Sequence, residues 1–316
     1  MRKVFLLSII LTAGYGYAQS TTDLNLLMDV NTTLIDNQLS PEIGKLEYAG
    51  GLTKGLFKAG DGKLLNKFQQ NILTASAFPW TLINNRHEQV FLGVGYVDQH
   101  FSDFSNQFYD SLFSENIRSI YLGTALSLRI THQLFWLSYV QTGFNGTKPL
   151  DHLDKTFNAV FITKGDYKPR RNLNIGLGIA YFTNMGSPLI LPAVSLIYSR
   201  PDFVLNIDFP VKTEIEAVVA HGKIRPVAGV SYHGGNYYLN ASHRYLYNYG
   251  ALGYLGVRFK LLDLVYFYVA YQEGLYDQYK SGLRQNLAEI GTYAGQSQFV
   301  ISLNVQVAKF IPRMQR

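Results

Sequence analysis

The sequence of 316 residues contains no cysteine, and it has few charged side chains. Without cysteine the chain has no disulfide, no cysteine-ligated zinc and no iron–sulfur cluster. Only 16% of the residues are charged, against about 25% in ordinary soluble domains. Disorder is excluded too, because disordered chains are poor in aromatic residues and this one has 23 Tyr, 20 Phe and 2 Trp. Low charge combined with many Tyr and Gly predicts β-structure in an unusual solvent.

The N-terminus has the pattern of an export signal. Arg2 and Lys3 precede an apolar run, Val4–Leu11, that is too short to anchor the chain in a bilayer. Gly16 and Ala18 then stand at the −3 and −1 positions of a signal-peptidase site. No cysteine follows, which excludes a lipoprotein anchor. We therefore expect a signal peptide over residues 1–18.

The remaining residues, 19–316, are expected to form one domain without a membrane helix. A spanning helix needs about 20 uninterrupted apolar residues, and the best candidate, Ala251–Tyr271, is interrupted by Arg258, Lys260 and Asp263. The domain is then either soluble or a β-barrel, the other architecture that satisfies every backbone polar group in lipid. Without Arg2 and Lys3 of the expected signal peptide, the formal net charge falls from +6 to +4, which is too small and too diffuse to indicate nucleic-acid binding.

Many segments alternate apolar residues with small or polar ones. In Leu173–Phe182 every odd position is apolar or Tyr, and the even positions up to 180 are Asn, Gly or Ala. Because successive side chains of a strand point to opposite faces, each such segment is a strand with one apolar face. The clearest examples are Ile120–Ile130, Leu173–Phe182, Phe203–Phe209 and Phe299–Ala308.

Two features favour a membrane barrel over a soluble β-sandwich. Aromatic residues gather near the ends of the predicted strands, as in the girdles of membrane barrels. The faces opposite the apolar ones carry Gly, Ala, Ser and Asn, whereas a soluble sandwich would present Lys and Glu there. We predict an all-β fold, a transmembrane antiparallel up-and-down β-barrel of about 14 strands within a range of 12–16.

The details of the C-terminal half are less regular. Ile224–Tyr232 and Tyr237–Ser242 are expected as separate strands joined by a Gly-Gly turn. A long polar connector is expected over Gln272–Gln296, with one or two helical turns at Leu283–Ile290. Leu24–Val30 is either a first strand or a segment that leads into the barrel.

The segment Leu173–Asn240 has a recognisable order of features. A Gly-rich strand leads to Met185-Gly186-Ser187-Pro188, a strand containing Leu191-Pro192 follows, and Asp208-Phe209-Pro210 precedes a further strand and a Gly-Gly turn. This order resembles a family of Bacteroidota outer-membrane β-barrels known only as a domain of unknown function. A looser resemblance links the chain to the PorP/SprF-type membrane components of type IX secretion. The resemblance implies fold and location, but no activity.

Catalytic and nucleotide-binding motifs are weak or missing. The sequence contains neither Gly-x-Ser-x-Gly nor His-Glu-x-x-His. Ser242 and His243 are adjacent, so on a strand they would face opposite ways. His152 with two neighbouring aspartates is a candidate cation site, but such a trio is more often a solvated turn. The Gly-x-Gly pairs at Gly93 and Gly176 lie within strand patterns, so we interpret these glycines as making room for a facing side chain or letting the sheet curve.

The predicted inner face carries the candidate functional residues. One interpretation is a wet lumen that passes small solutes, with Arg129, Arg258 and Lys260 favouring anions. The other is that these side chains bind one another and fill the barrel. A conduit for fatty ligands is a third possibility, because Tyr121 and Tyr139 lie on the same face. The lumen-facing candidates are Arg129, Gln141, Asn174, Asn206, Asp208, Asn240, Arg258, Lys260, Asn304 and Gln306.

The sequence as a whole predicts a non-catalytic outer-membrane protein of a Gram-negative bacterium that acts as a pore, a solute conduit or a structural component. No cofactor and no metal is expected. The expected partners are outer-membrane lipid and lipopolysaccharide, the barrel-assembly machinery and small solutes, but not nucleic acid. The competing hypotheses are a barrel enzyme that acts on lipid or surface glycan and a secreted soluble β-sandwich that binds a partner.

Overall fold

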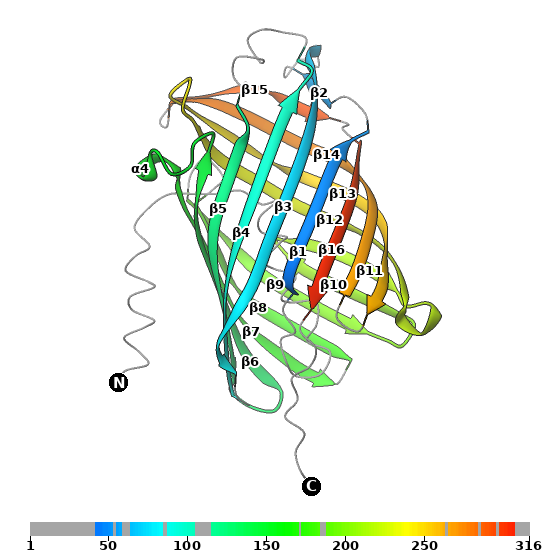
Figure 1. Cartoon of the computed structure of the whole chain (residues 1–316). Coiled ribbons are helices and arrows are strands. Elements are labelled where there is room, and N and C mark those ends of the chain that lie inside the picture. The colour runs from blue at the N-terminus through cyan, green and yellow to red at the C-terminus, as the bar shows by residue number, and fades with distance from the viewer. Residues whose placement is uncertain are drawn as a thin grey trace, which may run out of the picture.

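The strands form one antiparallel sheet that curls until its edges meet (Figure 1). The computed structural model describes residues 42–52, 55–58, 64–84, 87–104, 115–170, 172–183, 188–262, 265–283, 286–294 and 297–306. The first eight strands are β1 (Glu42–Gly51), β2 (Gly55–Lys58), β3 (Leu64–Asn84), β4 (Glu88–Ser102), β5 (Ile117–Arg129), β6 (Leu134–Gly146), β7 (Phe157–Arg170) and β8 (Leu173–Phe182). The other eight are β9 (Leu189–Ser199), β10 (Phe203–Phe209), β11 (Lys212–Ala217), β12 (Ile224–Leu239), β13 (Arg244–Leu262), β14 (Val265–Leu283), β15 (Asn286–Ala294) and β16 (Ser297–Gln306).

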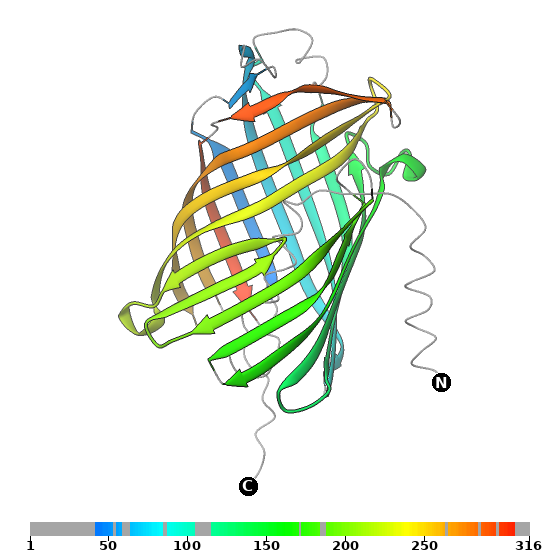
Figure 2. The same cartoon turned by 180° about the vertical axis from the view of Figure 1, so that it is seen from behind.

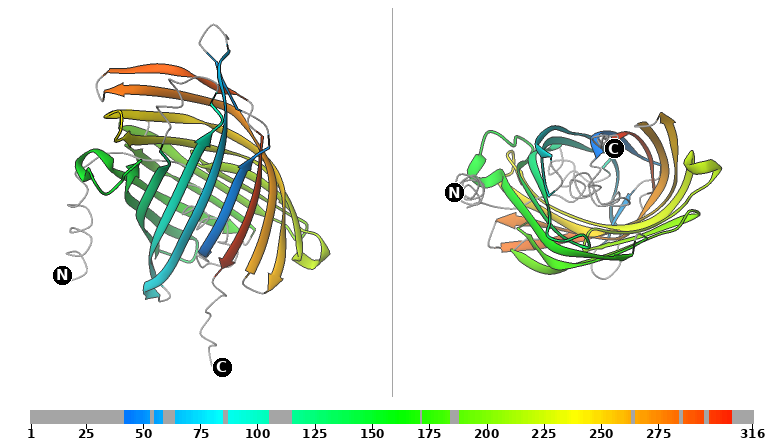
Figure 3. Two further views of the ribbon diagram at one scale, coloured as in Figure 1. Left: turned by 45° about the horizontal axis from the view of Figure 1, so that its top comes forward. Right: turned by 90° about the horizontal axis from the view of Figure 1, so that it is seen from below.

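The sixteen segments make a closed barrel of fourteen strands. β1 and β2 both pair antiparallel with β3, one after the other along its length, so they are two parts of one interrupted strand. β15 and β16 pair with β14 in the same way. β1 pairs with β16 and β2 with β15, which closes the ring. Figure 3 (right) shows the strands surrounding the interior. The predicted fold and strand number are confirmed.

The apolar stripe of each strand lies on the outside of the barrel. In β8, Leu177 is 70% exposed, whereas Asn174 on the opposite face is 5% exposed. The same alternation occurs in β5 and β16, where Leu122 and Ile301 are exposed and their sequence neighbours are buried. A water-soluble sandwich places its apolar stripe between two sheets instead. The outer surface is therefore apolar over much of the wall, as the period-two pattern predicts for a barrel.

The two ends of the barrel differ in their connections. At the end where β1 begins and β16 ends, neighbouring strands are joined by short segments, such as residues 130–133 between β5 and β6. The other end has short links too, such as residues 210–211 between β10 and β11, but it also has the two longest ones: residues 103–116 between β4 and β5, and the link that carries the short helix α4 (Leu153–Thr156). We call the second end the upper rim, as it stands in Figure 1.

Strands β12–β14 are much longer than the hairpins beside them. β10 and β11 have only seven and six residues, against sixteen in β12. The upper part of β12 runs past the ends of β7–β11 and meets β6, where Tyr238 pairs with Gly146. In Figure 2 the long yellow and orange strands cross above the shorter green ones. We call this junction the rim clasp; it joins strands that lie six apart in the sheet.

Hydrogen bonds and side chains of α4 hold the rim clasp. The Thr147 amide donates to the Tyr238 carbonyl (3.0 Å), and the Asn240 amide donates to the Thr147 hydroxyl (3.0 Å). From α4, the Lys155 ammonium donates to the Tyr238 hydroxyl (3.3 Å) and lies over its ring. That hydrogen bond is the main reason that the pKa of Lys155 is raised. The clasp therefore ties β6, β12 and α4 together above the short hairpins.

Three expectations about the C-terminal half are wrong. The Gly-Gly pair at Gly234 and Gly235 lies inside β12 and not in a turn. The expected connector over Gln272–Gln296 is the upper half of β14 followed by β15, so the expected helical turns are strand. β11 was not expected at all. Its sequence, KTEIEA, contains one large apolar residue and three charged ones, and short charged segments have low strand propensity. Leu24–Val30 and the predicted signal peptide lie outside the described residues.

Apolar side chains fill part of the interior. One buried cluster spans β4–β9 and the β10–β11 turn, and it includes Phe91, Tyr121, Leu137, Ile162 and Phe182. A second cluster lies toward the upper rim and includes Phe68, Phe101, Tyr237 and Tyr279. Polar and charged inner residues occur on every side of the barrel, from Gln99 and Lys164 to Glu214 and Asn304. The interior thus mixes packed apolar clusters with buried polar and charged side chains.

Candidate functional site: a charged network on the inner wall

Glycines on the inner face make room for long side chains. A Cβ atom on Gly176 would lie 1.9 Å from Asp166 Oδ1 and 2.1 Å from Ser195 Oγ. The Asp166 carboxylate therefore lies across Gly176 and accepts a hydrogen bond from Ser195 on the next strand (2.8 Å). In the same way, the ring of Tyr121 covers Gly95, where a Cβ would lie 2.0 Å from the ring. Of the two predicted reasons for these glycines, space for a facing side chain and curvature of the sheet, the first applies at Gly95 and Gly176.

A buried ion pair spans strands β7 to β10. Lys164 Nζ lies 2.8 Å from Asp208 Oδ1, and both side chains are almost fully buried. The lysine reaches past β8 and β9, whose residues at this level, Gly178 and Ala193, are small. Asp166 lies two residues further along β7. Buried charges are stable only when they are paired, so this pair holds β7 and β10 at a set distance.

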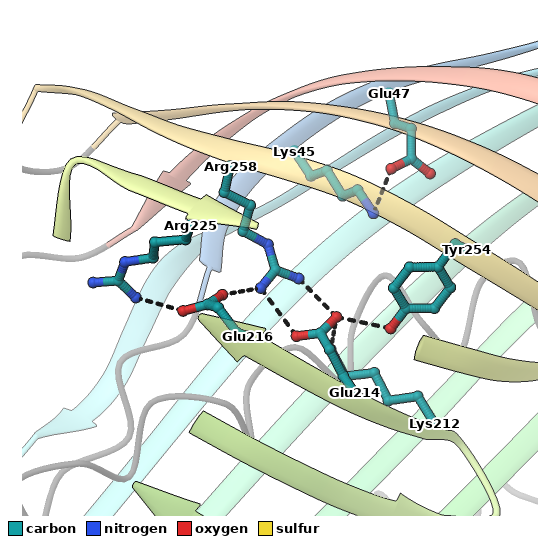
Figure 4. Close-up of polar contacts among 8 residues, drawn as sticks. All are labelled: Lys45, Glu47, Lys212, Glu214, Glu216, Arg225, Tyr254 and Arg258. Carbon is teal, nitrogen blue, oxygen red and sulfur yellow. Dashed lines mark hydrogen bonds and ion pairs between the residues drawn. The ribbon is translucent and has the colours of Figure 1, made fainter. Parts of the chain in front are cut away.

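A larger network joins β11, β12 and β13 (Figure 4). Arg258 of β13 donates to both carboxylate oxygens of Glu214 (3.0 and 2.9 Å) and to Glu216. Glu216 also accepts from Arg225 of β12 (2.9 Å). Glu214 also accepts from the Tyr254 hydroxyl (2.7 Å). Both glutamates are more than nine-tenths buried, so each has the cationic partners that burial requires.

Glycine again explains the geometry. Gly229 of β12 is the Cα partner of Glu214 on one side and of Tyr254 on the other. A Cβ on Gly229 would lie 2.6 Å from the Tyr254 hydroxyl. The tyrosine therefore lies flat across β12 to reach the glutamate on β11. Any other residue at this position would separate the two.

A cavity of about 80 Å³ lies beside this network. Its lining includes Lys45 and Glu47 of β1, which form an ion pair of 2.9 Å, together with Tyr268 of β14. From β11 come Lys212 and Glu214, whose charged atoms are 4.0 Å apart. Figure 4 shows Arg258 between these two Lys-x-Glu pairs. The cavity is therefore lined by both signs of charge.

The predicted lumen-facing residues fall into two groups in the structure. Gln141, Asn174, Asn206, Asp208 and Asn304 are buried. Gln141 accepts a hydrogen bond from Tyr139, Asp208 pairs with Lys164, and Asn304 accepts from Ser302.

Of the remaining five predicted residues, Arg258 lies in the charged network and the other four lie near the ends of their strands. Arg129 lies at the lower end, where it contacts His132 (2.8 Å) and the Phe135 ring. Lys260 is half-buried near the same end of β13. Asn240 follows β12 at the rim clasp. The side chain of Gln306 is outside the described residues.

The structure changes the expectation for Arg258. The sequence analysis grouped it with Arg129 and Lys260 as a source of anion preference, but its charge is balanced by Glu214 and Glu216. Sequence reasoning missed these glutamates together with Lys45, Glu47, Lys212, Lys164 and Asp166. A signal was present: Lys-x-Glu occurs in both β1 and β11, and period two places both charges on one face.

Other candidate chemistry has little support. Within the described ranges, no three His, Asp or Glu side chains are grouped so that they could hold a metal ion. The ring of His152 contacts Tyr238, and His243 hydrogen-bonds to the hydroxyl of the same tyrosine. Among the helices in the described part of the chain, none has the length and apolarity required to cross a membrane.

These observations define a class of protein: a closed fourteen-stranded antiparallel β-barrel with an apolar exterior and a charged network inside. The chain belongs to the family described as a domain of unknown function (DUF6268), which matches residues 61–268. The predicted membership of a family of unknown function is thereby confirmed. The assignment to Bacteroidota and the looser resemblance to type IX secretion components stay predictions. A search of curated proteins finds no match.

Three solved structures with a similar arrangement share little sequence identity with this chain. The TodX monoaromatic hydrocarbon channel (deltaS2 mutant) is 11% identical, with 93% of this chain and 99% of that chain covered and a TM-score of 0.43. The KdgM porin in complex with disordered oligogalacturonate is 7% identical, with coverage of 84% and 99% and a TM-score of 0.35. A BenF-like porin from Pseudomonas fluorescens Pf-5 is 9% identical, with coverage of 84% and 98% and a TM-score of 0.33.

Proposed function

We propose that this protein is an outer-membrane β-barrel that conducts small polar solutes through its interior without catalysis. The observation that carries the proposal is the division of the wall into an apolar outer face and a charged inner face with a cavity beside it. A strand whose apolar side chains point outward and whose polar side chains point inward can contact lipid on one face and water on the other.

The ends of the barrel support an orientation. In outer-membrane barrels the short turns face the periplasm and the longer loops face the outside. The two longest links lie at the upper rim, so the end where β1 begins would face the periplasm, and the rim clasp would face outward. The export signal predicted over residues 1–18 and the resemblance to Bacteroidota barrels support the same location. Outer-membrane lipid, lipopolysaccharide and the barrel-assembly machinery would then be its partners.

The experiment that tests conduction is reconstitution of the full chain into planar lipid bilayers. We expect discrete conductance steps with weak ion selectivity, because the inner wall carries both charges in comparable number. Replacing both Glu214 and Glu216 with Gln should shift the reversal potential toward anions. The matched control is the exposed Asp202→Asn at the lower end. A silent bilayer at high protein load, with membrane insertion shown by heat-modifiable gel migration, would contradict conduction.

A second candidate function is that of a structural membrane component. The packed apolar clusters favour it, because buried Phe, Tyr and Leu side chains occupy part of the interior. The two candidates differ in one measurement. A structural component would be inserted and heat-modifiable but silent in the bilayer, whereas a conduit would conduct.

A further inference from the structure

The cavity beside Arg258 combines features of a small-molecule binding site. It is formed by inner residues of β1, β11, β12, β13, β14 and β16, so strands far apart in sequence converge on it. Its volume of about 80 Å³ is several times the space of about 10–15 Å³ that one ordered water needs. A small solute therefore fits beside the charged network.

The charges around the cavity alternate over short distances. Lys45 and Glu47 are separated by 2.9 Å, Arg258 and Glu214 by 2.9 Å, and Lys212 and Glu214 by 4.0 Å. A ligand that carries only a positive or only a negative charge would lie close to cavity groups of its own sign as well as to groups of the opposite sign. Contacts between like charges are unfavourable. A ligand that carries both charges a few ångströms apart matches the alternation.

The neutral lining adds hydrogen-bonding groups of both kinds. Ser231 and Tyr254 present hydroxyls, and Gln272 and Asn304 present amides that both donate and accept. We infer that this cavity is a weak binding site for small zwitterions whose ammonium and carboxylate groups are separated by one carbon, the simplest being glycine. The ammonium would lie near Glu214 and Glu47, and the carboxylate near Arg258, Lys212 and Lys45.

Weak binding is the expected regime, because each charged group in the site already has an internal partner that the ligand must share. A conduit also requires that its solute leaves as readily as it enters. The inference deepens the proposed conduction by naming its solute class, and it rests on that function for its biological meaning. The binding itself is measurable without conduction.

The test is ligand-observed saturation-transfer NMR on the detergent-solubilised full chain with glycine, acetate and methylammonium as probes. We expect glycine to bind in the millimolar range, and acetate and methylammonium at least tenfold more weakly. The variant K45M/E47Q removes one ion pair without changing the net charge, and it should weaken glycine binding at least tenfold. Asp202→Asn, a carboxylate removal far from the cavity, should leave binding unchanged.

The outcomes separate the two proposals. Glycine binding by a protein that is silent in bilayers supports the site and overturns conduction. Conductance without glycine binding overturns the site and leaves conduction standing. Equal binding of the three probes, or unchanged binding by K45M/E47Q, shows that the site does not recognise the zwitterion. If K45M/E47Q fails to fold, the single variant E47Q, at the more exposed end of the same ion pair, is measured instead, and unchanged glycine binding by E47Q would also overturn the site.

Discussion

The network around Arg258 makes a prediction about stability that can be worked from the structure. Two opposite charges about 4 Å apart attract by about 4 kcal/mol at an effective dielectric constant of about 20. Arg258 contacts two glutamates, but Glu216 keeps Arg225 and Glu214 keeps Tyr254 when the arginine is removed. The arginine side chain is also 20% exposed, which allows some screening. Breaking a fully buried pair costs about 3–5 kcal/mol, so we expect Arg258→Met to lower the free energy of unfolding by about 2–4 kcal/mol.

The assay is equilibrium urea unfolding of the protein in phospholipid vesicles, followed by tryptophan fluorescence. The control is Arg200→Met, which removes an ion pair with Asp202 between two exposed side chains, and it should cost about 0–1 kcal/mol. The double variant R258M/E214Q should lose less than the sum of its single variants, with a coupling of about 1–3 kcal/mol. Equal losses for R258M and R200M, or no coupling with E214Q, would refute the view that the network holds β11 to β13.

Three further predictions follow from the wall, the glycines and the rim clasp. Leu177→Arg, on the most exposed part of the outer face, should lower the free energy of unfolding in lipid vesicles by about 2–4 kcal/mol. Leu261→Arg, near the lower end, should lower it by only about 0–1 kcal/mol. Equal losses for the two variants would argue against a lipid-facing wall. Gly95→Val would make the new side chain overlap the buried ring of Tyr121, so it should lower the free energy of unfolding by about 1–3 kcal/mol in the same assay. Gly165→Val, whose Cβ would have its nearest neighbour 4.0 Å away, should fold normally. A Gly95→Val protein of unchanged stability would contradict the packing of Tyr121 on Gly95. Gly146→Ala places a Cβ 2.3 Å from the Tyr238 carbonyl oxygen, which accepts a hydrogen bond in the rim clasp. Amide hydrogen exchange over residues 233–239 should therefore become faster. Unchanged exchange would show that the clasp does not hold the upper part of β12.

The strands and their faces were accessible from the sequence because side-chain alternation is a local property. In Leu173–Phe182 the pattern alone located β8 and separated its outer leucines from its inner glycines. The absence of disulfides and of an apolar helix left a barrel as the consistent membrane architecture. The approximate strand number followed from counting segments of the required length.

Local patterns failed where the strand itself was atypical. β11 is short and charged, so it lacks the apolar stripe by which its neighbours were found. The upper half of β14 and β15 carry polar residues that resemble a loop, and the glycines of β12 resemble a turn. At these positions the hydrogen-bonded pairing with adjacent strands decides the conformation. This pairing cannot be inferred from the sequence of one segment alone.

The sequence by itself determined that apolar residues alternate with small or polar ones along the strands and that the chain carries little charge. It also determined that the charged residues occupy the same face of the strands as the glycines. Only the tertiary structure decided which charges meet. Lys164 and Asp208, like Arg258 and Glu214, are 44 residues apart, and the pairs depend on the register of the strands between them, β8 and β9 for the first pair and β12 for the second. Ring closure brings β1 near β11, and the clasp brings β12 to β6, because a curled sheet makes neighbours of strands that the linear chain keeps far apart.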